Sequence, residues 1–370
     1  MRWFVVCLAA LAVAAGYTLS KGLGADSAQL TRVLLATIGH AAFAQAQPVP
    51  QAPAGNAVPV TADNFNRAET DMYFGKRVQR GGIGNLSHSR ELYLTDSPVV
   101  RPNRDTLYSG AVFDYDAGPV TITLPDAGNR FMSMQVIDED QYTHAVYYGA
   151  GHYTMTREDM GTRYGSLVIR ILANPKDPED MKQVHALQDA ITVEQKSSGK
   201  YEVRTFDPVS QKKVRDALLV LGTTIPDNKR MFGGRTEVDP VRHLIGSAML
   251  WGGLPEKDAL YLNITPDKND GASVYKLNVQ DVPVAGFWSI TVYNAKGHLE
   301  PNQYHAYSLN NITAKKHVDG SVAVQFGGCD GKISNCLPTM AGWNYMVRFY
   351  RPRAEVLSGT WTFPEAQRVN

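Results

Sequence analysis

The densest group of polar and aromatic side chains follows Val100, in the segment Arg-Pro-Asn-Arg-Asp-Thr-Leu-Tyr that ends at Tyr108. An amide, a guanidinium, a carboxylate and a phenol in one short segment can line the mouth of a ligand pocket. The candidate ligand-binding residues of this segment are Asn103, Arg104, Asp105 and Tyr108. Asn and Asp after a proline are also common turn formers, because their side chains bond to their own backbone. The segment therefore predicts either a pocket mouth or a local turn.

A second acidic group, Asp138-Glu-Asp140, follows a strand-like run and precedes His144. Clustered carboxylates with an imidazole can serve metal binding or acid–base chemistry. Asp105 and Asp138 are accordingly the candidate catalytic residues, as the acid and base of a hydrolase. A glycosidase requires two such carboxyl groups within about 10 Å of each other. A solvated acidic turn explains the same residues, since loops expose polar side chains.

The sequence lacks the common patterns of metal, nucleophile and phosphate sites. The nine histidines are scattered, with no pair four residues apart, so neither a metal nor another cofactor is expected. The G-x-S-x-G elbow of many serine hydrolases is absent. With 37 basic and 36 acidic residues the net charge is +1, and no basic run stands out. Nucleic acid is therefore not an expected partner, because phosphate binding needs a concentrated cationic surface.

The N-terminus has the pattern of an export signal. Arg2 precedes the apolar run from Trp3 to Ala15, and a second apolar run ends in Ala42-Phe-Ala-Gln. A basic start, an apolar centre and an A-x-A end are typical of export signals. Either a long signal is cleaved near Ala44 or Ala46, or the first run stays as an anchor. The protein is expected in the periplasm or cell envelope, with membrane contact only through an uncleaved N-terminal segment.

Cysteine usage agrees with export. Cys7 lies in the apolar run of the signal, which leaves Cys329 and Cys336 as a close pair flanked by turn residues. In an oxidising compartment such a pair commonly forms a disulfide that closes a loop. A metal site would need more ligands, and the nearest histidine, His317, stands alone. Two reduced thiols are the alternative.

Hydrophobic periodicity predicts a mainly β protein with helical insertions, an α+β fold. Short runs rich in β-branched and aromatic residues recur between Thr106 and Ile171 and again between Ala259 and Tyr350. Their spacing favours two antiparallel units of the β-sandwich or jelly-roll kind, joined by a helical segment. The expected divisions are an export signal or anchor over 1–46, a flexible tether over 47–62, a helix plus a β-rich domain over 63–195, a helical connector over 196–257, and a β-sandwich domain over 258–370.

Several segments resemble two bacterial families that occur together. The strings Arg101-Pro-Asn-Arg-Asp-Thr-Leu-Tyr108 and Arg130-Phe-Met-Ser-Met-Gln-Val-Ile-Asp138 are similar to domain-of-unknown-function family 1254. The strings Gly286-Phe-Trp-Ser-Ile-Thr-Val-Tyr293 and Val347-Arg-Phe-Tyr-Arg-Pro352 are similar to its usual companion, family 1214. The resemblance covers most of the chain from Asp63 onward. It implies two regions rich in β-sandwich structure in an exported protein, and it implies no reaction.

The resemblance also adds candidate positions to those found from the residues alone. Positions that recur in these families correspond here to Asn103, Asp105, Tyr108, Trp288, Tyr293, Arg348 and Trp361. The chain departs from the pattern at Cys336, where the families place a Trp before the Leu-Pro. This departure fits a local disulfide with Cys329.

The expected function is binding of a small-molecule, carbohydrate or lipid ligand in a groove between the β units. The residues expected to rim this groove are Asn103, Asp105, Tyr108 and Trp288, and Arg104, Tyr293 and Arg348 are further ligand-binding candidates. One alternative is a hydrolase of a small ester or glycoside that uses paired carboxylates. A structural protein of the envelope is the other. A homo-oligomer is compatible with each of the three.

Overall fold

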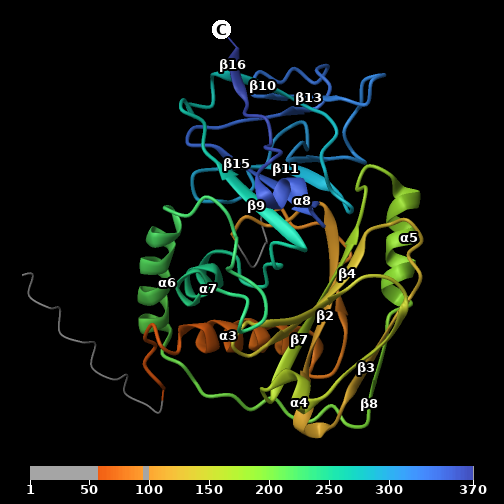
Figure 1. Ribbon diagram of the computed structural model, residues 1–370, viewed down its shortest axis with the longest axis vertical. Coiled ribbons are helices and arrows are strands. Elements are labelled where there is room, and N and C mark those ends of the chain that lie inside the picture. The colour runs from red at the N-terminus through yellow and green to blue at the C-terminus, as the bar shows by residue number, and fades with distance from the viewer. Residues whose placement is uncertain (1–56, 95–99, 370) are drawn as a thin grey trace, which may run out of the picture. The chain divides into compact units, whose positions relative to one another are not determined.

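The computed structural model describes residues 57–94 and 100–369 (Figure 1). The expected export signal or anchor over 1–46 and most of the expected tether lie outside these residues. Within the described ranges no helix is long and apolar enough to cross a membrane.

The first β unit consists of two sheets with a shared core. The larger has the order β1 (Ser87–His88), β2 (Thr106–Asp114), β7 (Tyr164–Leu172), β4 (Met132–Asp138), β5 (Thr143–Tyr147). The smaller has the order β6 (Gly151–Met155), β3 (Val120–Leu124), β8 (Thr192–Gln195). Because side chains alternate along a strand, one face of β7 sends Leu167, Ile169 and Ile171 into the core shared with β3. Helix α5 (Pro178–Asp189) closes this core with Val184.

The second β unit also consists of two sheets. One has the order β12 (Ser308–Asn310), β11 (Trp288–Tyr293), β15 (Asn344–Tyr350), β9 (Ala259–Ile264). The other has the order β14 (Cys336–Leu337), β13 (Val322–Phe326), β10 (Val274–Val279), β16 (Gln367–Val369). All strand pairs are antiparallel except the short pair of β13 with β14. Two such units in a mainly β chain confirm the predicted fold class.

The remaining helices cover the sheets. Helices α3 (Phe65–Gly81), α6 (Pro208–Gly222) and α7 (Pro240–Met249) pack on one another around Phe65, Leu218 and Ile245 (Figure 1). The Asp-Pro pairs begin α6 and α7 as their sequence indicates, with Asp207 and Asp239 accepting hydrogen bonds from the first free backbone N–H groups. Short helices α4 (Arg157–Met160), η1 (Tyr115–Ala117) and α8 (Ala354–Ser358) lie in connections.

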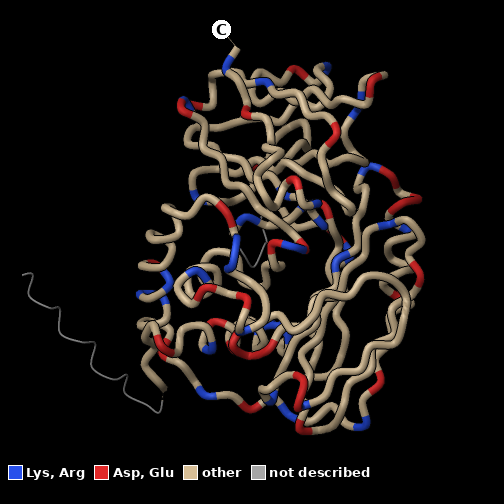
Figure 2. Tube along the Cα trace, in the orientation of Figure 1, with Lys and Arg blue, Asp and Glu red and all other residues tan. Residues whose placement is uncertain are grey.

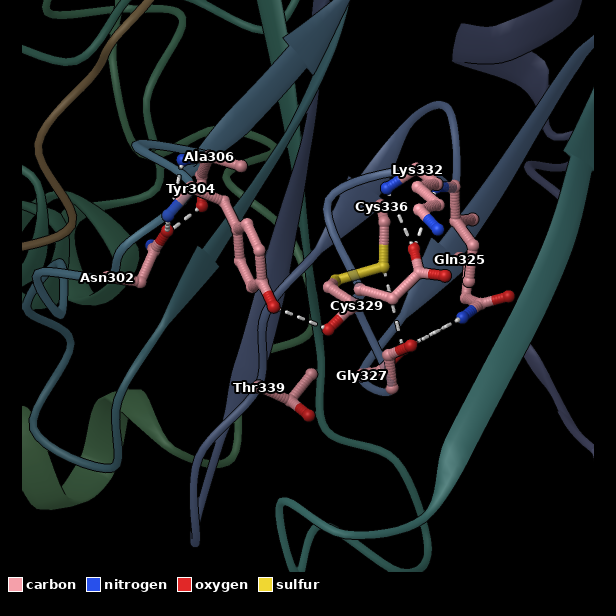
Figure 3. The surroundings of a disulfide bond; sticks show 12 residues. Asn302, Tyr304, Ala306, Gln325, Gly327, Cys329, Lys332, Cys336 and Thr339 are labelled. Atoms are coloured by element: carbon pink, nitrogen blue, oxygen red, sulfur yellow. Dashed lines mark hydrogen bonds between the residues drawn. A yellow bond between two sulfur atoms is a disulfide. The ribbon is translucent and has the colours of Figure 1, made fainter.

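The predicted disulfide between Cys329 and Cys336 is confirmed (Figure 3). It closes a loop next to β13. The Tyr304 hydroxyl supports this loop by donating a hydrogen bond of 2.8 Å to the Cys329 carbonyl. Asn302 holds the Tyr304 turn by accepting from the backbone N–H groups of Tyr304 and Ala306. The bond therefore fixes a loop that is already anchored on the second β unit.

Replacement of both Cys329 and Cys336 by serine is expected to lower the free energy of unfolding by about 2–3 kcal/mol, because a short closed loop loses its constraint on the unfolded chain. Urea unfolding of the variant and of the unaltered protein measures this, each with and without a reductant. The reductant should lower the stability of the unaltered protein to that of the variant and leave the variant unchanged. Equal stability of the two oxidised proteins would contradict the expectation.

Candidate functional site

A cavity of about 740 Å³ lies between the two β units. Its walls come from β2 and β7 of the first unit and from β9 and β15 of the second, and these elements can be followed in Figure 1. Helix α3 and the turn 250–253 after α7 complete the enclosure. The cavity is thus a groove between β units, closed on one side by α3 and by the turn after α7.

Strand alternation decides which side chains reach this cavity. On β7, Val168 and Arg170 face it, because Leu167 and Ile169 occupy the core of the first unit. On β15, Arg348 and its neighbours Met346 and Tyr350 face it, while the intervening residues belong to the core of the second unit. The two arginines therefore stand on strands whose opposite faces are apolar.

The cavity wall carries an excess of positive charge. Six of its cationic side chains form no ion pair with an acidic side chain anywhere in 57–94 or 100–369. They are Lys76, Arg77, Arg80, Arg101, Arg170 and Arg348. A seventh, Arg90, pairs with Asp189, and Glu91 is the acidic residue of the wall. Figure 2 shows acidic and basic positions interspersed along the trace, so this local excess contrasts with a balanced chain.

Arg77 lies against the first β unit over Gly110. A Cβ atom at Gly110 would come within 2.7 Å of Arg77 Nη1, so the missing side chain makes room for the guanidinium. Its hydrogen bond within the described residues is a long one, 3.4 Å from Nη1 to Ser87 Oγ. Burial lowers the pKa of Arg77, and the nearby charge of Arg80 lowers it further. An arginine nevertheless stays charged, so Arg77 is a partly buried cation without a counter-ion.

Arg101 occupies the other end of the wall in a left-handed backbone conformation, with φ of 51°. Its N–H donates to the Gly297 carbonyl at 2.8 Å, and its own carbonyl accepts from Arg348 Nη2 at 3.0 Å. Such a conformation costs about 1–3 kcal/mol and is often retained where a ligand binds. Burial lowers the pKa of Arg101, and the charge of Arg348 adds to the effect.

Arg170 forms part of the floor between these ends and is 5% exposed. It donates to Gln135 Oε1 at 2.9 Å and to the Gly252 carbonyl at 2.7 Å, and it lies over the ring of Tyr108. These neutral acceptors orient the guanidinium but leave its charge uncompensated.

Aromatic and apolar groups make up much of the rest of the wall. They are Tyr73, Leu92, Tyr93, Val100, Tyr108, Val168, Leu250, Trp251, Tyr261, Met346 and Tyr350. Trp251 stacks on Tyr73 with ring centroids 4.5 Å apart, which fixes one broad apolar surface. The arrangement suits a ligand that combines negative charge with an apolar body.

Three of the candidates from the sequence, Asn103, Tyr108 and Arg348, line the cavity. Asn103 Oδ1 accepts from the Asp105 N–H at 2.6 Å, which is the local turn that the sequence allowed. Its Nδ2 donates to the Tyr350 hydroxyl at 2.5 Å across the two β units. The segment is therefore a turn and a part of the cavity wall at once.

Asp105 lies behind the wall and is fully buried. Its Oδ1 accepts from Asn310 Nδ2 at 3.0 Å, which joins the start of β2 to β12 of the second unit. Burial raises the pKa of Asp105, and the charge of Arg348 and the bond from Asn310 oppose the rise. Asp105 thus connects the β units. The expectation that it rims the groove is wrong, because its side chain lies behind the wall.

Trp288, Tyr293 and Arg104 also lie away from the cavity. Trp288 shares the face of β11 that carries Ile290 and Val292, so alternation places it in the core of the second unit and not at the groove. Tyr293 is buried, donates to the Pro102 carbonyl at 2.7 Å and accepts from Arg348. Arg104 donates to the Tyr93 carbonyl and stacks on Tyr307. Tyr293 and Arg104 therefore anchor the loop segments before β2, and Trp288 is part of the core.

Asp138 is far from Asp105. Thr106, next to Asp105, pairs with Leu172, whereas Asp138 pairs with Gly165, and seven residues of β7 span about 23 Å. The two carboxylates therefore do not form the acid–base pair expected of a glycosidase. Asp138 lines a separate cavity of about 490 Å³, where its Oδ2 lies 2.9 Å from His144 Nε2. No group of three or more metal-ligating side chains occurs among the residues that the structure describes.

Comparison with known proteins places this fold in a family. Residues 83–195 match the family model described as "Protein of unknown function (DUF1254)", and residues 258–354 match "Protein of unknown function (DUF1214)". The chain thus contains a DUF1254 region followed by a DUF1214 region. Both matches fall where the sequence resemblance predicted them.

Two solved structures resemble this chain, and the first shares its fold. The VPA0106 protein from Vibrio parahaemolyticus is 19% identical, with a TM-score of 0.65 over 84% of this chain and 98% of its own. An uncharacterised protein from Burkholderia cenocepacia is 13% identical, with a TM-score of 0.48 over 83% of this chain and 87% of its own. No curated protein matches the chain.

Sequence reasoning missed the cationic wall of this DUF1254–DUF1214 protein. Its members come from a helix, a loop and strands of both family regions, so only folding brings them together. One signal was present in the sequence. Arg170 and Arg348 each interrupt an otherwise apolar strand, Leu167–Leu172 and Tyr345–Tyr350, and a buried arginine is rare unless it has a partner or a role.

Proposed function

We propose that this protein binds an organic anion in the cavity between its β units. The observation that carries the proposal is the set of six cationic side chains that line one cavity without an ion pair. Lys76 and Arg80 are exposed, whereas the other four cations are half-buried or buried. Burial of unpaired charge is unfavourable, and a carboxylate or phosphate on a ligand would compensate it. Arginine suits this role, because its planar guanidinium can donate two parallel hydrogen bonds to such a group.

We further propose that the protein acts outside the cytoplasm, in the periplasm or cell envelope. The pattern of the N-terminal residues supports export. The Cys329–Cys336 disulfide is compatible with an oxidising compartment.

A hydrolase is the second candidate, and it would pair Asp138 with His144 and not with Asp105, the partner first expected. Asp138 Oδ1 accepts from the backbone N–H groups of Asp140 and Tyr142, and Oδ2 faces His144. An imidazole oriented by a carboxylate can act as a general base. This pair lies in the smaller cavity, so anion binding and hydrolysis are separable by substitution.

The proposal is tested by calorimetric titration of the full chain with octanoate and phenylacetate and with their uncharged amides. The acids are expected to bind at least about tenfold more tightly than the amides, since hydrogen bonds to charged groups contribute about 1.5–3 kcal/mol. The variant Arg77→Met/Arg101→Met should lose most of this difference, because it removes a cation from each end of the wall and keeps apolar stems.

The matched control is Arg204→Met, which removes an exposed arginine outside the cavity wall. It should bind the acids as the unaltered protein does. Equal affinity for acids and amides, or unchanged acid binding in the double variant, would contradict the proposal.

A further inference from the structure

The unpaired cations of the cavity fall into two groups. Lys76, Arg77 and Arg80 project from the last turns of α3, and the charge of Arg80 acts on Arg77. Arg101 and Arg348 belong to the side of the second β unit, where Arg348 donates to the Arg101 carbonyl. Arg170 lies on the floor, with its donors directed to Gln135 and Gly252. Arg348 also directs its donors to the hydroxyls of Thr291 and Tyr293. The α3 group and Arg101 are therefore the ones with guanidinium donors left for a ligand.

Strand β2 gives the separation of the two groups. The Arg77 guanidinium lies over Gly110, and the other end of the strand begins at Thr106. Four residues of an extended strand span about 13 Å. Asn103 contacts both Thr106 and Tyr350, and Tyr350 lies two residues from Arg348 on the same face of β15. The Arg77 guanidinium thus stands roughly 13 Å from the start of β2, where Asn103 and Tyr350 connect to the side of the cavity that carries Arg101 and Arg348.

The wall between the two groups is largely aromatic and apolar. Tyr108 lies midway along this stretch of β2, and Trp251, Tyr261 and Met346 face the same space. A ligand with a single charge would compensate one group and leave the other unpaired. A ligand with a charge at each end and an apolar middle would match both groups and the wall between them.

We infer that the ligand is an elongated dianion, with anionic groups at both ends of an apolar chain, as in a medium-chain α,ω-dicarboxylate. This inference rests on the proposed function and specifies the ligand class of the same cavity. One anionic group binds Arg77 and Arg80, and the other binds Arg101 beside Arg348. The apolar chain lies along Tyr108.

The test is calorimetric titration of the full chain with succinate, adipate, sebacate and dodecanedioate, and with the monoacids decanoate and laurate. Affinity is expected to rise along the diacid series, and sebacate or dodecanedioate should bind at least about tenfold more tightly than the monoacid of equal length. Succinate is too short to reach both groups and should show no such advantage.

Single substitutions separate the two ends. Arg77→Met and Arg101→Met should each weaken binding of the best diacid about tenfold, to the level of the monoacid, since each leaves one end unpaired. Each should weaken monoacid binding less, because the other end is still present. Arg204→Met again serves as the control and should change neither.

The outcomes distinguish this inference from the proposed function on which it rests. If monoacids bind and long diacids bind no more tightly, the two-ended ligand is overturned while anion binding stands. If neither monoacids nor diacids bind, both are overturned. A diacid advantage that survives Arg77→Met and Arg101→Met would also overturn the inference, because it would place the second anionic group elsewhere.

Discussion

Replacement of Asp105 by alanine is expected to lower the free energy of unfolding by about 3–5 kcal/mol, because it removes a fully buried carboxylate whose charge acts on the buried Arg348 without a direct ion pair. The substitution also removes the acceptor of Asn310, which is itself buried. Because Asp105 joins β2 to β12, the loss falls on the contact between the β units. Asp105, a catalytic candidate in the sequence, is therefore expected to stabilise the fold.

Urea unfolding of Asp105→Ala and Asp105→Asn measures this effect. The asparagine variant keeps the shape and an acceptor for Asn310 but lacks the charge, so it should lose less stability than the alanine variant. Asp216→Ala is the control, since Asp216 is exposed and pairs with Lys212 on the same helix. It should change the free energy of unfolding by at most about 0.5 kcal/mol. Unaltered stability of Asp105→Ala would contradict the assigned role.

Asp71→Asn is expected to make the protein more stable at pH 8 and to leave its stability unchanged at pH 4. Burial raises the pKa of Asp71 to about 7, the Glu139 carboxylate adds to the rise, and Arg67 opposes it. The folded state therefore keeps the Asp71 proton at a pH where the unfolded chain has lost it. The contribution of Asp71 to the free energy of unfolding is therefore fully present below about pH 4 and is lost as the pH rises to about 7. This loss amounts to at most roughly 4 kcal/mol.

The measurement is the difference in urea unfolding between the unaltered protein and Asp71→Asn across this range. Asparagine resembles the protonated carboxyl, so the difference should open between pH 4 and pH 7 and then stay constant. Asp63→Asn, at an exposed position just before α3, should show no such trend. If the two proteins differed in free energy of unfolding by the same amount at every pH, the raised pKa of Asp71 would be contradicted. Since α3 also carries Arg77, the cavity wall depends on a helix whose anchoring varies with pH.

The β-strands and their sidedness were readable from the sequence, because alternation is a local property. The two β units, the Asp-Pro starts of α6 and α7 and the Cys329–Cys336 disulfide followed from short patterns. The same alternation could have placed Trp288 in the core, since Ile290 and Val292 share its face. For deciding whether a side chain faces the core or the groove, its position in the strand alternation is thus a better guide than its residue type.

The cavity itself could not be derived in this way. Arg77 and Arg348 are brought to one space only by packing of α3 and β15 against different sheets, and no local pattern encodes that contact. The distance between Asp105 and Asp138 likewise depends on the pairing register of β2, β7 and β4. Asn103 and Tyr108, named from the sequence, and Arg348, named from the family resemblance, line one cavity, and their part in ligand binding stays a prediction. The positive charge of the wall was not foreseen.

The measurement that tests anion binding most directly is a crystal structure of the full chain soaked with ω-bromooctanoate, with bromine located by its anomalous signal. We expect one strong bromine peak in the cavity between α3 and β15, with the carboxylate against arginine, and no peak there after a soak with ω-bromooctanamide. Bromine absent from this cavity, or present equally with the acid and the amide, would contradict anion binding in the cavity.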